Sequence, residues 1–183
     1  MNHADHLFLL KNGIRSPAGV WAEFGSGGGA FTRALVELTR PGALIYSVDR
    51  DKQALNRQAI VIRERFHSRE TGIIYLHADY TAPLELPALD GVLMANSLHF
   101  QENKLPLLKK IFDYLRPGGC MLLVEYNCDR GNNWVPFPLS FDTWHHLAPQ
   151  AGFRDTRLLA KVPSSFMGEI YSAQSCKIDM QRA

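Results

Sequence analysis

The sequence is poor in cysteine and lacks any long hydrophobic run. Its 183 residues include three cysteines, Cys120, Cys128 and Cys176, whose odd number and wide spacing fit neither a disulfide framework nor a zinc site. A reducing, cytoplasmic location is therefore expected. No stretch approaches the length of a membrane span. The opening MNHADHLFLLKNG has no basic start and no small-residue cleavage pattern, so a signal peptide is not expected.

The sequence also lacks a large excess of positive or negative charge. The formal net charge is +2, and the sequence has no basic stripe or arm, so nothing indicates a nucleic-acid partner. No constellation of metal-ligating residues is visible, and no metal is expected. The hydrophobic fraction of 46% is enough for a full core. We expect a single domain over residues 1–183.

What the sequence does contain is an alternation of strand-like and helix-like segments. Short apolar runs that predict strands alternate with amphipathic runs that predict helices, which indicates a parallel sheet with helices on both faces. The expected strands are 18–23, 43–48, 72–77, 91–95 and 121–125, and the expected helices are 31–38, 51–66, 104–115 and one that begins after Ser140 and ends before Gly152. The runs 156–161 and 170–176 predict a closing antiparallel pair. The prediction is a doubly wound, seven-stranded α/β fold.

A glycine-rich stretch joins the first expected strand to the first expected helix. It reads EFGSGGG over residues 23–29, with Gly25, Gly27 and Gly29 at alternate positions. Ligands of open parallel sheets bind at such turns, where glycine admits a close approach to the backbone and the helix N-terminus attracts anions. A nucleotide-like ligand is one interpretation. A tight turn that needs glycine only for its backbone dihedrals is the other.

Two acidic residues favour the ligand. Asp49 ends the second expected strand about twenty residues after the glycines, where a carboxylate accepts hydrogen bonds from ribose hydroxyls. Asp79 ends the third expected strand, from which an adenine amine is within reach. Because the carboxyl ends of parallel strands share one edge, these groups should lie together.

These features together resemble the class I S-adenosylmethionine-dependent methyltransferases over nearly the whole chain. The glycine stretch resembles the first motif of that family, and Ser47–Arg50 and His77–Tyr80 resemble the second and third. Residues 89–99 resemble the fourth, LRPGG at 115–119 resembles the turn before strand five, and the closing strand pair resembles the family's final hairpin. The cofactor that the resemblance implies is S-adenosylmethionine.

The resemblance also implies roles for individual residues. Glu23 would support the glycine loop or the amino group of the cofactor, Asp49 the ribose and Asp79 the adenine. Arg50 would cover the adenine face, although an exposed arginine is the simpler interpretation. The remaining cofactor contacts implied by the motifs are Gly25, Ser26, Gly27, Tyr80 and Asn96.

Two alternatives stay open at this point. Residues 25–30 also read as G-x-G-x-x-A with Asp49 downstream, which is typical of NAD(P)-dependent oxidoreductases. The acid at position 23, the LRPGG turn and an antiparallel last strand are not required by that fold. A non-catalytic subunit that binds S-adenosylmethionine is the second alternative, because the motifs concern binding only.

On the acceptor side, His99 and Glu125 are the candidate catalytic residues. Both follow or end strands at the same edge, and histidine titrates in the range useful to a general base. A structural hydrogen-bonding role is the alternative for His99. Residues 132–138 and 164–167 are candidate walls for a small-molecule acceptor, with core packing as the alternative. Residues 1–17 are expected either to form a lid over the cofactor or to pack elsewhere on the sheet.

Overall fold

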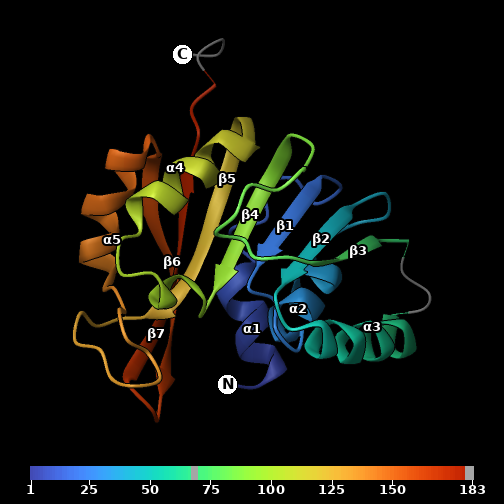
Figure 1. Ribbon diagram of the computed structural model, residues 1–183, viewed down its shortest axis with the longest axis horizontal. Helices are drawn as coiled ribbons and strands as arrows, with labels where there is room; N and C mark the ends of the chain where they lie inside the picture. Colours follow the sequence, from blue (N-terminus) through green and yellow to red (C-terminus); the bar gives the residue numbers. More distant parts are fainter. Residues whose placement is uncertain (67–69, 180–183) are drawn as a thin grey trace.

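The computed structural model describes residues 1–66 and 70–179 and has a seven-stranded sheet at its centre (Figure 1). The strand order is β3-β2-β1-β4-β5-β7-β6, in which β1 to β5 run parallel and β7 is antiparallel to both β5 and β6. The strands are β1 (Val20–Phe24), β2 (Leu44–Asp49), β3 (Gly72–His77), β4 (Leu89–Ala95), β5 (Leu115–Tyr126), β6 (Arg154–Ser164) and β7 (Gly168–Cys176). The predicted doubly wound fold with a closing antiparallel hairpin is confirmed.

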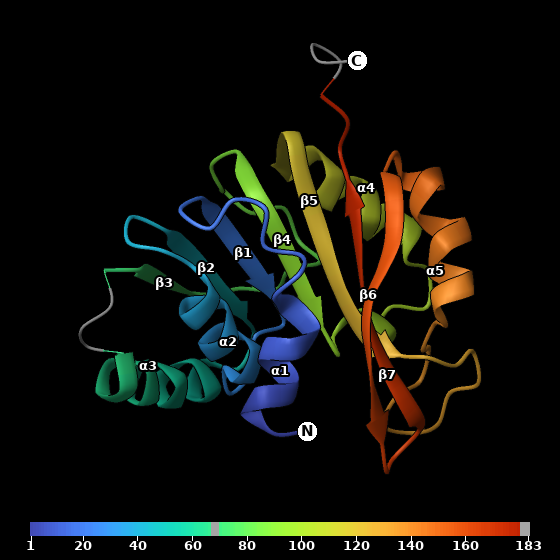
Figure 2. The same ribbon diagram turned by 180° about the vertical axis from the view of Figure 1, so that it is seen from behind.

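Helices cover both faces of this sheet (Figures 1 and 2). One face carries α1 (His3–Leu10), α2 (Ala30–Leu38) and α3 (Lys52–Phe66), and the other carries α4 (Leu105–Tyr114) and α5 (Phe141–Leu147). Two short 3-10 turns, η1 (Leu98–Phe100) and η2 (Ala148–Ala151), follow β4 and α5. Each face has its own apolar core: Phe24, Met94 and Trp144 lie in one, and Trp21 and Leu93 lie in the other. Side chains that alternate along a strand thus fill opposite cores.

Local sequence signals explain where several helices begin. Ser140 caps α5 as expected, because its side chain accepts a hydrogen bond from the backbone N–H of Thr143. At α1, Asn2 and Asp5 form a reciprocal capping box. The short helix that the first residues suggest is therefore present. It packs against α2 and the β6–β7 pair and places Leu9 and Leu10 in the core with no exposed surface.

The start of β5 differs from the sequence interpretation. We expected residues 116–119 to form a turn between α4 and a strand beginning at Met121. Instead α4 ends at Tyr114, and β5 begins at Leu115, which pairs with Leu89 before the register shifts. Pro117 and Gly118 lie inside this irregular, solvent-exposed segment. The helix stops as expected, but the chain continues in extended form because β4 is available as a partner.

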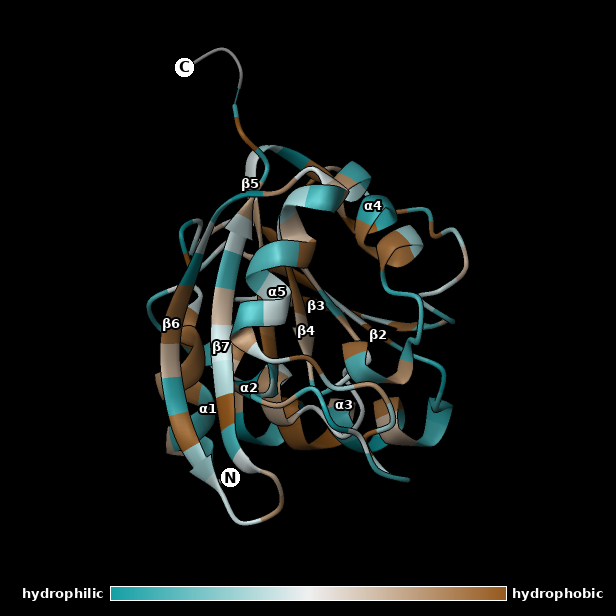
Figure 3. Ribbon diagram, turned by 90° about the vertical axis from the view of Figure 1, so that its left-hand side faces the viewer, coloured by the Kyte–Doolittle hydropathy of each residue, from teal (hydrophilic) through white to brown (hydrophobic). Residues whose placement is uncertain are grey.

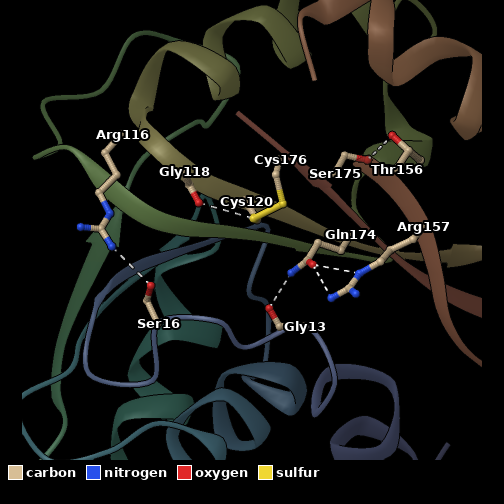
Figure 4. Close-up of a disulfide and its surroundings, with 10 residues drawn as sticks. All are labelled: Gly13, Ser16, Arg116, Gly118, Cys120, Thr156, Arg157, Gln174, Ser175 and Cys176. Atoms are coloured by element: carbon tan, nitrogen blue, oxygen red, sulfur yellow. Dashed lines mark hydrogen bonds between the residues drawn. A yellow bond between two sulfur atoms is a disulfide. The ribbon is translucent and has the colours of Figure 1, made fainter. Parts of the chain in front are cut away.

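The expectation that the cysteines form no disulfide is wrong for Cys120 and Cys176. These residues, separated by 56 positions in sequence, lie opposite each other on β5 and β7 and are bonded (Figure 4). The flanking hydrogen bond from Lys177 N–H to Gly119 O makes this a non-hydrogen-bonded antiparallel pair, the ladder position of closest approach. Their Cα atoms are 4.0 Å apart. Because disulfides persist mainly in oxidising compartments, this bond counts against the cytoplasmic location, which stays a prediction.

The two ends of the sheet are exposed edges. In Figure 3, teal and brown segments alternate along the edge strand β6, which faces solvent on one side. At the opposite edge, Ile74 of β3 is exposed. Among the residues described, no helix is both long and apolar enough to cross a membrane.

Candidate functional site

A cavity of about 620 Å³ lies at the carboxyl ends of β1 to β4. The strand order changes direction between β1 and β4, so this is the switch point at which open α/β sheets bind ligands. Each lining segment follows a strand directly. The lining residues are Gly25, Gly27, Asp49, Arg50, Asp79, Tyr80, Thr81, Asn96, Ser97, Phe100 and Gln101.

The three alternating glycines have different roles. All three adopt left-handed backbone conformations, with φ of 78° at Gly25, 51° at Gly27 and 76° at Gly29. A β-carbon at Gly25 would lie 2.6 Å from Cβ of Ser97, and one at Gly29 would lie 2.3 Å from Cγ of Gln58. A β-carbon at Gly27 would meet nothing within 4 Å. Gly25 and Gly29 are therefore required by protein packing, whereas at Gly27, which lines the cavity as Gly25 does, no neighbouring protein atom excludes a side chain.

Asp49 supports the glycine loop as well as lining the cavity. Its Oδ2 accepts a hydrogen bond of 2.7 Å from the N–H of Gly27, and its Oδ1 accepts one of 2.8 Å from the N–H of Asp51. A carboxylate oxygen has a further lone pair after one such bond. Asp49 thus retains acceptor capacity toward a ligand while it holds the loop in place.

Asp79 stands at the rim of the cavity as an ionised acceptor. The side chain and backbone N–H of Thr81 donate to its Oδ1, and these hydrogen bonds hold the pKa of Asp79 below its usual range. Neighbouring Tyr80 stacks on Phe24 with ring centroids 6.2 Å apart, and its hydroxyl donates to the carbonyl of Ser97. Burial raises the pKa of Tyr80, so the hydroxyl keeps its proton and this hydrogen bond.

Asn96 is the most unusual residue in the cavity. It has a φ of 51°, a left-handed value that is uncommon for a residue with a side chain. Its backbone N–H donates to the carbonyl of Val124, but its side-chain Oδ1 is buried and has no hydrogen-bond partner among the residues that the structure describes. A buried, unpaired acceptor is costly unless a ligand satisfies it, and strained backbone concentrates at binding sites. Asn96 therefore combines a place in the cavity lining with a side-chain oxygen that lacks a hydrogen-bond donor among the described residues.

Glu23 and Ser26 lie behind the cavity rather than on its surface. Glu23 is 2% exposed, and the hydroxyl of Thr32 on α2 donates to its Oε2. Burial raises the pKa of Glu23 to about 8. The hydroxyl of Ser47 donates to Oε1 of Gln58 at 2.7 Å and lies 2.8 Å from the hydroxyl oxygen of Ser26. Both residues brace the glycine loop, and direct contact of either with a cofactor stays a prediction.

His99 and Glu125 form a buried pair next to the cavity. Nδ1 of His99 lies 2.8 Å from Oε2 of Glu125, and the side chains are 4% and 0% exposed. Oε1 of Glu125 also accepts from the backbone N–H groups of Leu98 and His99. Glu125 therefore fixes both the 3-10 turn η1 and the orientation of the histidine ring. Neither side chain lines the cavity itself.

Four lining residues were not among the sequence-based candidates. Thr81, Phe100 and Gln101 lie just beyond the predicted motifs, and Ser97 lies within the fourth. Ser97 and Gln101 flank the named His99 on either side. The signal that could have found them is distance from a strand end, because every residue in the few positions after a parallel strand reaches the same edge.

Similarity to known proteins shows to which family the chain belongs. A family model described as a methyltransferase domain matches residues 22–123, which is more than half of the chain and includes all eleven cavity-lining residues. The chain belongs to this methyltransferase family. It is an S-adenosylmethionine-dependent methyltransferase. No curated protein sequence matches the chain.

Solved structures similar to this methyltransferase agree with the fold. A putative methyltransferase from Bacillus halodurans superposes with a TM-score of 0.74 at 13% identity, covering 96% of this chain and 99% of that one. A possible exported protein from Bordetella parapertussis gives a TM-score of 0.73 at 14% identity, covering 96% and 67%. Human N-acetylserotonin methyltransferase in complex with SAM gives 0.67 at 22% identity, covering 94% of this chain and 51% of the human chain. The present chain thus spans about half the length of the human enzyme.

The residues present fit the cofactor of the family. S-adenosylmethionine carries an adenine amine, ribose hydroxyls and an ammonium group, all of them donors. The cavity offers the acceptors Asp79, Asp49 and Asn96 in the same order along the sheet edge, and the Asn96 oxygen lacks a partner. Within the described part of the chain, no three His, Cys, Asp or Glu side chains are grouped so as to hold a metal ion.

Proposed function

We propose that this methyltransferase transfers the methyl group of S-adenosylmethionine to a small-molecule acceptor. The observation that carries the proposal is Asn96, which lines the cavity on left-handed backbone and whose buried Oδ1 has no hydrogen-bond partner among the described residues. A single hydrogen-bond acceptor of this kind suits the ammonium group of the cofactor. When bound, the cofactor supplies a methyl group that its sulfonium has already activated.

The other cofactor contacts follow from the acceptor positions. Asp49 accepts from the ribose hydroxyls with the lone pairs left over from Gly27 and Asp51, and Asp79 accepts from the adenine amine. Arg50 and Tyr80 line the same part of the cavity and enclose the adenine. Gly25 and Gly27 provide the loop along which the cofactor lies. These assignments ask the protein mainly to bind, orient and exclude water.

We propose that His99 takes the proton released by the methyl acceptor and that Glu125 positions His99. The carboxylate holds Nδ1 of the ring at 2.8 Å, which leaves Nε2 as the nitrogen available to take a proton. Glu125 is fully buried and engaged in three hydrogen bonds, so it acts through His99 rather than on the acceptor.

A small acceptor is supported over a nucleic acid by the charge of the chain. The net charge of +2 provides no electrostatic surface for a phosphate backbone. The human structural neighbour is named for N-acetylserotonin, a small molecule. No observation favours the two alternatives, an NAD(P)-dependent oxidoreductase or a non-catalytic subunit that binds S-adenosylmethionine.

The test is a calorimetric titration with S-adenosylmethionine, S-adenosylhomocysteine and NADH. We compare the wild type with Asp79→Ala, which removes an exposed rim carboxylate, and with Asp113→Ala, a control on the exposed side of α4. Loss of one charged hydrogen bond costs about 2 kcal/mol, so Asp79→Ala should weaken the two adenosyl ligands roughly 10- to 50-fold. Asp113→Ala should leave them unchanged. Preferential binding of NADH would overturn the proposal.

A further inference from the structure

Four aromatic side chains gather beside the cofactor cavity, and we call them the aromatic wall: Phe100, Tyr126, Trp134 and Phe166. They come from η1, the end of β5, the loop at 127–139 and the β6–β7 turn. In Figures 1 and 2 this loop and this turn lie side by side at the sheet edge where β4 ends. Trp134 is 72% exposed, Phe100 55% and Phe166 50%. Single exposed apolar residues are normal, but a contiguous set marks a binding surface.

Three of the four rings contact one another in turn, and Phe100 is linked to them through the ring of His99. Trp134 meets Phe166 with ring centroids 6.2 Å apart at 78°, and Phe166 meets Tyr126 at 5.8 Å and 67°. Edge-on contacts of this kind support each ring while leaving faces free for a further ring to stack against. Tyr126 packs against the apolar core, and Trp134 and Phe166 stand out from it with half or more of their surface exposed.

The wall is continuous with the cofactor cavity. Phe100 lines that cavity together with Asn96 and Ser97. The His99 ring lies between the two parts of the wall, with its centroid 4.4 Å from that of Phe100 and 6.3 Å from that of Tyr126. A molecule stacked on the wall would thus have one end near the proposed methyl donor and near His99.

The loop that carries Trp134 is held in place by hydrogen bonds. Oδ1 of Asn132 accepts from the backbone N–H groups of Trp134 and Val135, and its amide contacts Sδ of Met167 in the β6–β7 turn. The N–H of Phe137 donates to the carbonyl of His99. The loop is thereby tied to both neighbouring segments, so the rings are displayed in a fixed arrangement before any ligand binds.

Two lysines on the segments around the wall are engaged by other groups of the protein. Nζ of Lys104 donates to the carbonyls of Gln101 and Phe137, and Lys161 lies 2.9 Å from Glu169. The four rings of the wall are themselves uncharged at neutral pH. An uncharged, planar molecule is the chemistry that suits this surface.

We propose that the aromatic wall is the acceptor subsite and that the acceptor is a neutral, planar aromatic molecule carrying a hydroxyl group. This rests on the proposed function. In the transfer, an acceptor oxygen forms a bond to the methyl carbon as the bond from that carbon to sulfur breaks, and the sulfur keeps the electron pair. The hydroxyl proton passes to His99. A hydroxyl needs such a base more than a neutral amine does, because the amine nitrogen attacks with its own lone pair and releases its proton afterwards.

The experiment uses Trp134 as a reporter, because the other two tryptophans, Trp21 and Trp144, are 1% and 0% exposed. Acrylamide quenching of the tryptophan fluorescence is measured in the presence of S-adenosylhomocysteine with 1-naphthol, with its saturated counterpart 1-decalol and with neither. We expect naphthol to protect Trp134 at least five-fold better than decalol. Equal protection, or none, overturns the proposal.

Turnover of a panel of one- to three-ring phenols, matched arylamines and matched aliphatic alcohols is then followed as S-adenosylhomocysteine release. The variants are Trp134→Ala and Phe166→Ala, with Phe8→Ala as a control that removes an exposed ring, 45% exposed on α1 and outside the wall. The wall variants should raise KM for phenols ten-fold or more with little change in kcat, and Phe8→Ala should change neither. Activity confined to amines or aliphatic alcohols, or no activity on any member of the panel, contradicts the acceptor class.

The same titrations separate this proposal from the proposed function. If S-adenosylmethionine binds with unchanged affinity to Trp134→Ala and the wild type does not methylate phenols, the acceptor class is wrong. The methyltransferase assignment of the cavity then stands. If S-adenosylmethionine does not bind the wild type, the proposed function fails first. A dimer in sedimentation velocity that dissociates on Trp134→Ala would show that a second copy covers the wall, which also overturns the proposal.

Discussion

At the scale of single residues, Glu23 shows how burial changes the chemistry of a motif residue. It is 2% exposed beside Thr32, and burial raises its pKa to about 8. The folded protein therefore keeps a proton on Glu23 that the unfolded chain releases near pH 4.5. The native state binds more protons between these values, so this group's contribution to stability is complete below pH 4.5 and declines up to about pH 8.

The Glu23→Gln variant tests this directly, because glutamine keeps the acceptor for Thr32 and cannot ionise. We expect the variant to gain stability relative to the wild type as pH rises from 5 to 9, by as much as about 4 kcal/mol. Urea unfolding of both proteins across this range gives the difference, in which the other titrating groups cancel. A difference that stays constant with pH would falsify the assignment of a raised pKa to Glu23.

Gly29 shows that a motif glycine can serve packing rather than the ligand. A β-carbon there would overlap Gln58, which cannot easily move because it is hydrogen-bonded to Ser47 and to the carbonyl of Gly27. Gly42 has a similar φ of 87° with nothing within 4 Å, so it is a matched control for backbone strain alone.

We expect Gly42→Ala to cost about 1 kcal/mol and Gly29→Ala about 2 to 4 kcal/mol. Thermal and urea unfolding measure both. Equal losses in the two variants would mean that Gln58 gives way and that only the dihedral angle matters at Gly29.

At the scale of elements, the β5–β7 pair is joined both by hydrogen bonds and by the Cys120–Cys176 disulfide (Figure 4). The bond joins the middle of β5 to the last residue of β7, whereas the cofactor cavity lies at the carboxyl ends of β1 to β4. Cross-linking residues that are 56 positions apart restricts the unfolded chain, and chain entropy predicts a stabilisation of about 4 kcal/mol.

The double variant Cys120→Ser/Cys176→Ser should lose roughly this stability and retain its affinity for S-adenosylmethionine. Cys128→Ser is the control, since Cys128 is the free cysteine and lies outside the pair. Urea unfolding with and without a reductant measures the first effect, and calorimetry the second. The idea of a structural bond fails if reduction leaves the wild type as stable as before.

The position of helix α1 is also set by contacts between elements. Its residues are amphipathic enough to fold over a cofactor or to pack on the sheet. Leu9 and Leu10 are fully buried against α2 and the β6–β7 pair, and no residue of 1–17 lines the cavity. This placement favours packing on the sheet rather than a lid over the cofactor, because burial of two leucines stabilises the docked helix by several kcal/mol.

At the scale of the whole molecule, the sheet should be most stable at its centre. The strands β1, β4 and β5 are paired on both sides, and all but one residue of β1 and β4 and all of Gly119–Glu125 in β5 are buried, whereas β3 pairs only with β2. Opening of a paired central strand requires most of the core to separate, and an edge strand can detach alone.

Hydrogen exchange followed by mass spectrometry should therefore find the slowest amides in β1, β4 and β5, and exchange at least ten-fold faster in β3. Bound S-adenosylmethionine should slow exchange further in the segments that follow β1 to β4, because they form its site. Equal protection of β3 and β1 would contradict this order of stability.

The sequence by itself determined the order of elements and the position of the site. Hydrophobic periodicity and strand-end acids are local signals, and parallel strands bring their carboxyl ends to one edge, so Gly25, Gly27, Asp49, Arg50, Asp79, Tyr80 and Asn96 all line one cavity, and their contact with the cofactor stays a prediction. The sequence could not determine which of two elements a side chain faces. Only the tertiary structure turned Glu23 and Ser26 behind the loop, placed Cys120 opposite Cys176 and gathered the aromatic wall. Each of these depends on residues far apart in sequence, whose distances are set by sheet register and by packing rather than by local propensity.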